Sequence, residues 1–272
     1  MKNIVFTFYF LFLTCNLFSQ VSYPFFNNMK GERKLFADTV ISRVAPSTGA
    51  AFDDTLLQGT SIIILMQVPY SEVRNNVASP WLKVMYKKGK YNKVGFISAI
   101  DVAINEKIKS KNIEFIWGVV ANSRKDSLIN GEIKSFNIYQ CKLIALQENK
   151  KVTENYFKID DFFNVDSIAI QVIEKIKLKN AVCAIEIKDY NLKDTTKEFF
   201  KRTFVFCKSK NIVELPLTHN YSNLKNIDFP TSNLSYFTKK NSFTLNTDYR
   251  KLMPENIIEV YKWQNCSYTL IQ

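Results

Sequence analysis

Four short stretches of the sequence decide the fold, namely VISRVAPS at residues 40–47, GT at 59–60, WLKV at 81–84 and VGFI at 94–97. Pro46 imposes turn geometry at the end of the first stretch, and Gly59 does so after a second apolar segment. Residues 62–68 form a continuous apolar run of a strand's length. The last two stretches flank a lysine-rich turn, which is the layout of a β-hairpin. Five short strands in about 70 residues predict a compact barrel over residues 35–103.

The four stretches resemble the bacterial SH3-like (SH3b) domain family, whose pattern runs roughly L-N-V-R-S-G-P-S, then K-G-T, then W-x-K-V, then T-G-W-V. The chain departs from this pattern at Ile41, where Asn is preferred, at Ala45, where Gly is common, and at Phe96, where Trp or Tyr is usual. The resemblance covers about a quarter of the chain and implies a small SH3-like barrel. It also implies a non-catalytic module of an exported protein, because many such modules hold cell-wall peptides or polysaccharides.

Three aromatic residues of this region are the candidate ligand-binding residues: Tyr70, Trp81 and Tyr86. Together they would offer an aromatic surface to a sugar or a peptide. The alternative is that they fill the barrel, because a small barrel needs large side chains in its interior. We favour this interior role for Trp81 and leave both roles open for the two tyrosines.

The first twenty residues, MKNIVFTFYFLFLTCNLFSQ, have the layout of a secretory signal peptide over residues 1–19. Their apolar run is too short for a permanent transmembrane helix. We expect cleavage between Ser19 and Gln20. The residues before Cys15 lack the small side chain of a lipoprotein signal, so lipidation is not expected. No later apolar run has membrane length. The mature chain is therefore expected to lack a transmembrane segment and to be exported, to the periplasm or to the extracellular surface.

The chain is basic, with 37 Lys and Arg against 25 Asp and Glu. Loss of Lys2 with the signal peptide leaves 36 basic side chains and a net charge of +11. Outside the cytosol the available polyanions are lipid headgroups, anionic polysaccharide and cell-wall polymer, so nucleic acid is not an expected partner. Lysines that alternate with aliphatic residues, as at 175–179, are explained more readily by a solvated strand face than by a binding patch.

Beyond a lysine-rich boundary at residues 107–111, the sequence predicts a second, mostly-β domain at residues 112–272. Apolar segments of a strand's length alternate there with polar turns, which predicts an antiparallel sheet or a sandwich. Residues 168–179 are also compatible with a helix, because their apolar residues fit either period. The expected fold class is therefore all-β, with a small barrel followed by a larger antiparallel domain of unknown function.

Four cysteines remain after the signal peptide: Cys141, Cys183, Cys207 and Cys266. In an oxidising compartment they permit two disulfides in three possible connectivities. Buried thiols are an equally good explanation, because a chain of this size does not need covalent links. None of the cysteines has the close spacing of a zinc site. We expect neither a metal nor a cofactor.

The sequence offers no convincing catalytic residues. A Cys–His or Ser–His mechanism needs a histidine base, and the only histidine, His219, follows a proline in a polar turn. Two carboxylates remain the one route to hydrolysis. The adjacent pairs Asp53-Asp54 and Asp160-Asp161 would point to opposite faces of an extended strand, and both are explained by turn polarity.

These observations predict a non-enzymatic exported binding protein. Its SH3-like module would recognise a cell-wall or anionic envelope polymer, or an envelope protein. One alternative is a hydrolase that cleaves cell-wall glycan with two carboxylates. Another is a scaffold component of an envelope protein complex.

Overall fold

In the computed structural model, the described residues are 24–26, 29–129, 132–160, 167–191, 197–219, 231–237, 241–248 and 256–271. Within them nineteen β-strands form four antiparallel sheets, and the only helical elements are two 3₁₀ turns, η1 (Pro24–Phe26) and η2 (Ala99–Asp101). No helix in this part of the chain has the length and apolar character needed to cross a membrane. The prediction of an all-β protein is confirmed.

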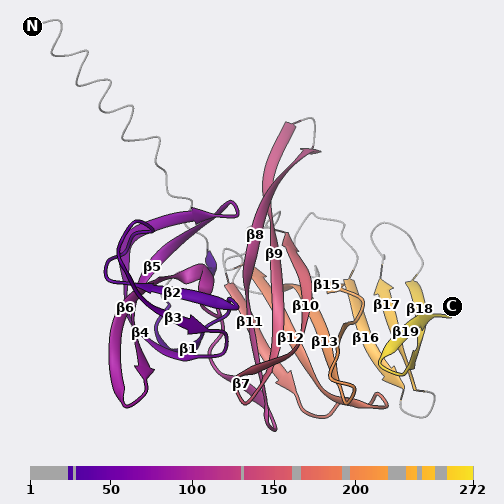
Figure 1. Ribbon diagram of the computed structural model, residues 1–272. Coiled ribbons are helices and arrows are strands. Elements are labelled where there is room, and N and C mark those ends of the chain that lie inside the picture. Colours follow the sequence, from indigo (N-terminus) through magenta and orange to yellow (C-terminus); the bar gives the residue numbers. More distant parts are fainter. Residues whose placement is uncertain are drawn as a thin grey trace, which may run out of the picture.

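The first sheet curls into a half-barrel (Figure 1). Its strands are β1 (Gly31–Lys34), β2 (Thr39–Arg43), β3 (Phe52–Leu57), β4 (Ser61–Arg74), β5 (Val77–Lys88) and β6 (Tyr91–Ser98). They follow the order β1-β4-β5-β6-β2-β3. Side chains alternate across each strand, so Ile62, Ile64 and Val84 fill the inside while Ile63 faces outward. Residues 35–103 contribute five of these strands, and β1 lies just before them.

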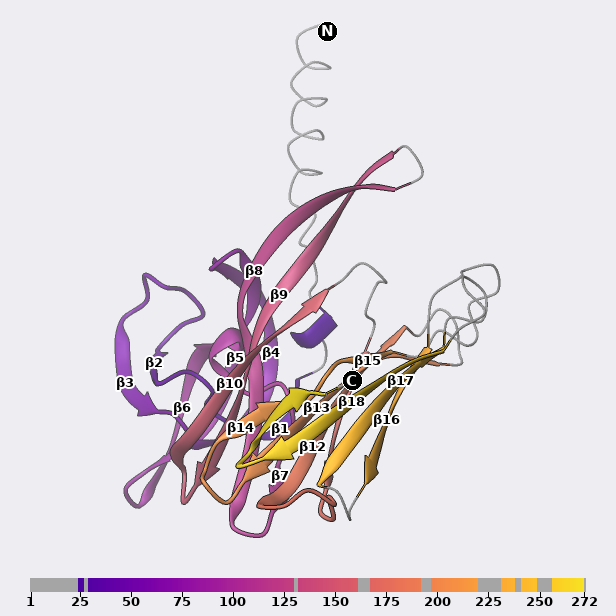
Figure 2. The ribbon, with the colours of Figure 1, turned by 90° about the vertical axis from the view of Figure 1, so that its right-hand side faces the viewer.

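Three further antiparallel sheets follow in a row, with the half-barrel at one end (Figures 1 and 2). The second sheet contains β7 (Ile108–Ser110), β8 (Ile113–Ile129), β9 (Glu132–Gln147) and β10 (Lys150–Asp160). The third contains β11 (Ser167–Ile173), β12 (Ala181–Asn191), β13 (Lys197–Cys207), β14 (Ile212–Glu214) and β15 (Thr218–His219). The fourth contains β16 (Thr231–Phe237), β17 (Ser242–Asp248), β18 (Asn256–Gln264) and β19 (Ser267–Leu270). The prediction of antiparallel sheets for this region is confirmed. Residues 168–173, which were compatible with a strand or a helix, form a strand.

The sheets stack because their central strands are apolar on both faces. In β8, Phe115 and Trp117 point toward the third sheet, where the Phe115 ring lies 5.6 Å from that of Phe206. The residue between them, Ile116, belongs to a separate apolar cluster on the opposite face. In β13 the same alternation turns Val205 toward the fourth sheet. Each inner sheet is thus a shared layer between two cores.

A close approach joins the half-barrel to the second sheet. The Phe36 ring packs onto Gly118 of β8, where a Cβ atom would lie only 2.8–2.9 Å from the ring carbons. The Lys142 ammonium nitrogen lies 5.3 Å from the centre of the same ring. One apolar cluster also runs from the half-barrel into the third sheet. The division into domains at 35–103 and 112–272 stays a prediction, and the two parts are in extensive contact.

One disulfide joins the third sheet to the fourth. It links Cys207 at the end of β13 to Cys266 in the turn between β18 and β19, over a sequence separation of 59. Cys141 and Cys183 are both buried and take no part in this bond. The observed arrangement therefore combines the two explanations that the sequence left open, because one pair is bonded and two cysteines keep their thiols.

Candidate functional site

The three candidate aromatic residues do not form one exposed surface. Trp81 and Tyr86 are buried, with 4% and 2% of their surfaces exposed, while Tyr70 is 60% exposed. Trp81 and Tyr86 are five residues apart in β5, so they point to opposite faces of that strand. This separation alone prevents them from sharing a binding surface. Trp81 is buried as we expected, but on the face of β5 opposite to Leu82 and Val84, so the prediction that it fills the barrel stays a prediction.

Tyr86 lies instead at the centre of a buried polar cluster. Its hydroxyl donates a hydrogen bond to Asp53 Oδ2 at 2.8 Å, and the Ser42 hydroxyl oxygen lies 3.2 Å from the Tyr86 oxygen. Burial, with a smaller contribution from the nearby carboxylates, raises the pKa of Tyr86 to about 12. The tyrosine therefore stays neutral and acts as a hydrogen-bond donor between β5 and β3.

Asp53 and Asp54 reach the same group of lysines, which differs from the expectation that they point to opposite faces. Ser42 pairs with Asp54, but its neighbour Arg43 pairs with Phe52, so Asp53 is the extra residue of a β-bulge. The bulge rotates one carboxylate toward the other side of the strand. The expected alternation fails here because it assumes a regular strand.

Two lysines of the β5–β6 hairpin neutralise these carboxylates. Lys88 donates to Asp54 Oδ1 at 2.5 Å, and Lys93 lies 3.4 Å from Asp53 Oδ1 and 3.9 Å from Asp54 Oδ2. The hydrogen bond from Lys88 lowers the pKa of Asp54, against the opposing effect of its burial. A carboxylate held ionised by a lysine is a poor proton donor.

Gly95 explains why the VGFI stretch needs a glycine. A Cβ atom at this position would overlap the Ser42 hydroxyl oxygen and lie 3.4 Å from the Arg43 carbonyl oxygen. The β2 strand therefore approaches β6 more closely than any other residue at position 95 would allow. This close approach positions Ser42 beside Tyr86.

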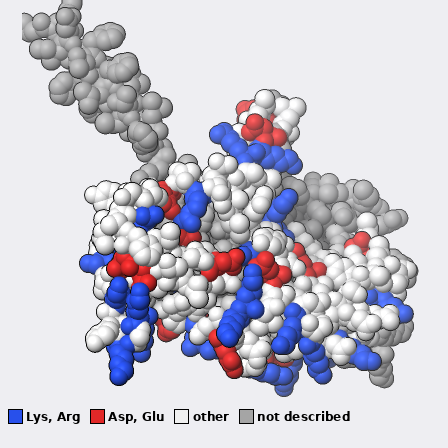
Figure 3. Space-filling view, viewed as in Figure 1, with Lys and Arg blue, Asp and Glu red and all other residues white. Residues whose placement is uncertain are grey.

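The outer side of the same hairpin carries lysines that are not neutralised. The sequence from residue 73 to residue 100 contains no Asp or Glu. Five lysines lie on β5, β6 and their turn, and together they are here called the basic end: Lys83, Lys87, Lys88, Lys90 and Lys93. Within the part of the chain that the structure describes, no carboxylate lies within 4.0 Å of the ammonium groups of Lys83, Lys87 or Lys90. Figure 3 shows blue side chains gathered where the half-barrel reaches furthest from the other sheets. Tyr91, beside this turn, is 78% exposed.

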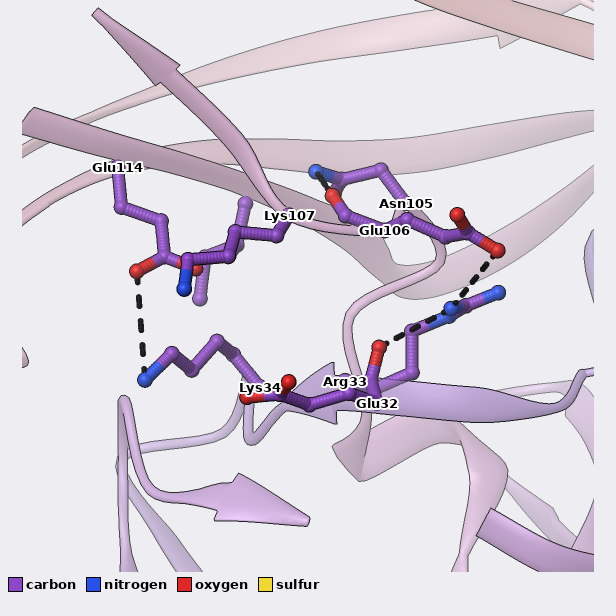
Figure 4. Close-up of a pocket in the computed structure, with 8 residues that line it drawn as sticks. Glu32, Arg33, Lys34, Asn105, Glu106, Lys107 and Glu114 are labelled. Atoms are coloured by element: carbon purple, nitrogen blue, oxygen red, sulfur yellow. Dashed lines mark hydrogen bonds and ion pairs between the residues drawn. The ribbon is translucent and has the colours of Figure 1, made fainter. Parts of the chain in front are cut away.

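A polar pocket of about 210 Å³, open solvent included, lies between β1 and the start of the second sheet (Figure 4). Lys34 and Glu114, both buried, approach to 4.0 Å across it, and Lys34 also donates to Asn149 Oδ1 at 2.7 Å. Burial lowers the pKa of Lys34. Among the described residues, no partner hydrogen-bonds to Glu114 Oε1 or Arg33 Nε. The pocket thus offers one acceptor and one donor to water or to a small polar group.

Sequence reasoning missed this pocket. Its residues come from three separate segments, at 32–34, 105–107 and 114–116, and only the packing of two sheets brings them together. The one signal in the sequence is the alternating charge of GERK at 31–34 and NEK at 105–107. Such alternation is common on solvated strands and indicates no pocket by itself.

Several sequence-based expectations lie outside the described residues. These are the cleavage site at Ser19 and Gln20, and Asp161 with the side chain of Asp160. The backbone of His219 is described and pairs with Phe200, but its side chain is not. In the described ranges, no three His, Cys, Asp or Glu side chains are grouped so that they could hold a metal ion.

Comparisons with known proteins add no relative to this description. No family model matches the chain, and neither curated proteins nor solved structures give a significant match. The resemblance to the SH3b family therefore stays a prediction from the four sequence stretches.

Proposed function

We propose that the protein is a non-enzymatic, exported binding protein that recognises an anionic component of the cell envelope through its basic end. The single observation that carries the proposal is the lysine distribution. Five lysines lie between residues 83 and 93, and no acidic residue lies between 73 and 100. Such a surface raises the local concentration of anionic groups and favours their binding.

The two faces of the hairpin divide these lysines into two classes. Lys88 and Lys93 are held by the carboxylates of Asp54 and Asp53, so their charge is locally compensated. Lys87 and Lys90 are exposed, and so is the ring of Tyr91, which follows Lys90 and pairs with Lys88 across the hairpin. Carboxylate, phosphate or sulfate groups of a polymer would meet these lysines, while the tyrosine ring offers an apolar face to a sugar.

Export is supported by the disulfide as well as by the predicted signal peptide. Disulfides persist in oxidising compartments and are rare in the cytosol. The Cys207–Cys266 bond joins two stacked sheets, so it belongs to the folded architecture rather than to a mobile terminus.

Binding rather than cleavage is supported by the environment of the paired carboxylates. A glycoside hydrolase needs one carboxylic acid with a raised pKa and a second carboxylate across a groove. Asp54 has a lowered pKa and Asp53 accepts a hydrogen bond from Tyr86, with Lys93 close to both. These contacts favour a structural role for both carboxylates.

A second candidate function, a scaffold that contacts an envelope protein, is favoured by the hairpin of β8 and β9. This hairpin projects well beyond the stacked sheets (Figure 2). Near its tip, Leu128 and Ile133 are cross-strand partners and are 72% and 76% exposed. An exposed aliphatic pair on a projecting hairpin fits a protein contact better than a polar polymer.

The proposal is tested by measuring the affinity of the chain from Gln20 onward for polygalacturonate, an anionic polysaccharide, as the salt concentration is varied. Dextran, which is neutral, serves as the control ligand. We expect binding to polygalacturonate that weakens steadily as salt rises, because exposed charges are screened, and no binding to dextran. Equal affinity for the two polymers, or no affinity for either, would contradict the proposal.

A further inference from the structure

The outer face of the half-barrel carries an exposed apolar surface, here called the outer ladder. Ile63 of β4 pairs with Met85 of β5, which pairs with Val94 of β6. One step along, Lys83 of β5 pairs with both Met66 and Phe96. Ile63, Met66 and Val94 are 42%, 50% and 49% exposed, and Leu65, at the bulge in β4, is 48% exposed. Three adjacent strands thus contribute aliphatic side chains to one face.

This face is not needed for the core of the half-barrel. The opposite faces of the same strands supply Ile62, Ile64, Val84 and Ile97, all of which are at most 5% exposed. An antiparallel sheet with one face packed on a core ordinarily turns polar side chains to water on the other. The outer ladder breaks that pattern, so its apolar residues call for a partner.

The lysines around the outer ladder indicate the charge of that partner. Lys83 and Lys87 lie on the same face of β5 as Met85, because they are two residues away on either side. Lys90 lies in the turn beyond, next to Tyr91. Not one carboxylate occurs in the sequence from 73 to 100, so the β5 and β6 part of the surface carries positive charge only. Glu32 of β1, which pairs with Ile63, is an exposed carboxylate at the edge of the outer ladder.

We propose that the outer ladder and its lysines form a docking surface for an anionic lipid bilayer. The aliphatic side chains would enter the boundary between headgroups and acyl chains, while the lysines extend to the lipid phosphates. The inference rests on the proposed function and names the anionic envelope component as a lipid surface.

Two other occupants fit the same surface less well. A hydrophilic anionic polymer would use the lysines but would leave the aliphatic ladder in water. A specific protein interface ordinarily matches charges of both signs to fix its register, and the charges of this face are mainly positive, with Glu32 as a carboxylate at its edge. The combination of mainly positive charge with unpatterned aliphatic groups suits a fluid surface.

The experiment measures binding of the chain from Gln20 onward to two kinds of vesicle by co-sedimentation. One contains phosphatidylglycerol and phosphatidylcholine in equal parts, and the other contains phosphatidylcholine alone. The wild type should bind the anionic vesicles and not the neutral ones. The double variant Ile63→Thr/Val94→Thr keeps strand-forming side chains and all the lysines. Its vesicle affinity should fall by about tenfold or more, from the loss of apolar area, while its affinity for polygalacturonate stays unchanged.

A matched control changes two exposed isoleucines elsewhere, Ile257→Thr/Ile258→Thr on β18, which are 49% and 55% exposed. This variant should bind the vesicles as the wild type does. The single variant Met66→Gln lies at the exposed end of the outer ladder and should show a smaller loss in the same direction. It provides the test if the double variant does not fold, as judged by circular dichroism.

The outcomes separate this inference from the proposed function. Binding of polygalacturonate without binding of anionic vesicles would overturn the lipid surface alone and would favour a polymer. Vesicle binding that is unchanged in both outer-ladder variants would overturn the docking face. Loss of binding to every anionic probe would overturn the proposed function as well.

Discussion

The hydroxyl of Tyr86 donates a 2.8 Å hydrogen bond to Asp53, a residue that reaches it only because a bulge sits in β3. The bond joins the centre of the half-barrel to one of its edge strands. It also holds Asp53 near Lys93, on the hairpin whose outer side carries the unpaired lysines. The polar interior is therefore connected to the basic end through the contacts of Asp53 with Tyr86 and Lys93.

Replacement of Tyr86 by Phe should destabilise the fold. The change keeps the ring and removes the hydroxyl, which leaves Asp53 Oδ2 without its donor. We expect the free energy of unfolding to fall by about 2 kcal/mol, as for a hydrogen bond to a charged group. Urea unfolding followed by circular dichroism measures it. An unchanged midpoint would show that Tyr86 contributes only its ring.

Stability should also decline at alkaline pH, in part through Tyr86. Its pKa is about 12 in the folded chain and about 10 in an unfolded one. The folded state therefore holds the proton more tightly, and this stabilisation is present below pH ~10 and is lost as the pH rises toward ~12. Tyr86→Phe should show a shallower decline in unfolding free energy over that interval. An identical slope in the two proteins would contradict the assignment.

Gly95→Ala should destabilise the half-barrel by about 1–3 kcal/mol, the usual cost of overpacking. The added methyl group would overlap the Ser42 hydroxyl oxygen. Ser42→Ala removes that atom, so the double variant should regain part of the lost stability. Gly49→Ala is the control, because the nearest atom to its Cβ is Ser47 Oγ at 3.8 Å. Additive effects of the two substitutions at 42 and 95 would argue against direct contact.

Reduction of the Cys207–Cys266 disulfide should cost about 4 kcal/mol of unfolding free energy, from the loop entropy that a bond across 59 residues removes. Urea unfolding with and without reductant tests this value. Peptide mapping of the unreduced chain should recover the segments around 207 and 266 as one linked species. Linkage of Cys141 to Cys183 instead would disprove the pairing.

The sequence predicted the half-barrel strands well because turn residues and apolar alternation are local signals. Pro46, Gly59 and the lysine turn at 87–90 each act through their own backbone or side chains. The stacking of later sheets is also readable in part, since Phe115, Ile116 and Trp117 are consecutive and apolar, which is typical of a strand buried on both faces.

Features that depend on pairing between distant segments could not be predicted from local sequence signals. The bulge at Asp53 is defined by its partners Ser42 and Arg43, so alternation within β3 alone gave the wrong direction for one carboxylate. The pairing of Cys207 with Cys266 was one of several that four cysteines permit. The three aromatic candidates do not form one binding surface, because Trp81 and Tyr86 are an odd number of residues apart in β5 and therefore point to opposite faces. That relation can be stated only once both residues are known to lie in one strand.

The most direct test of the anionic-binding account is the affinity of the triple variant Lys83→Gln/Lys87→Gln/Lys90→Gln for polygalacturonate. Its control is Lys208→Gln/Lys210→Gln, which removes two exposed lysines from the turn after β13. With each exposed contact worth about 0.5–1 kcal/mol, we predict roughly tenfold or greater loss of affinity in the triple variant and none in the control. Equal affinity of the triple variant and the wild type, with the fold intact, would contradict the account.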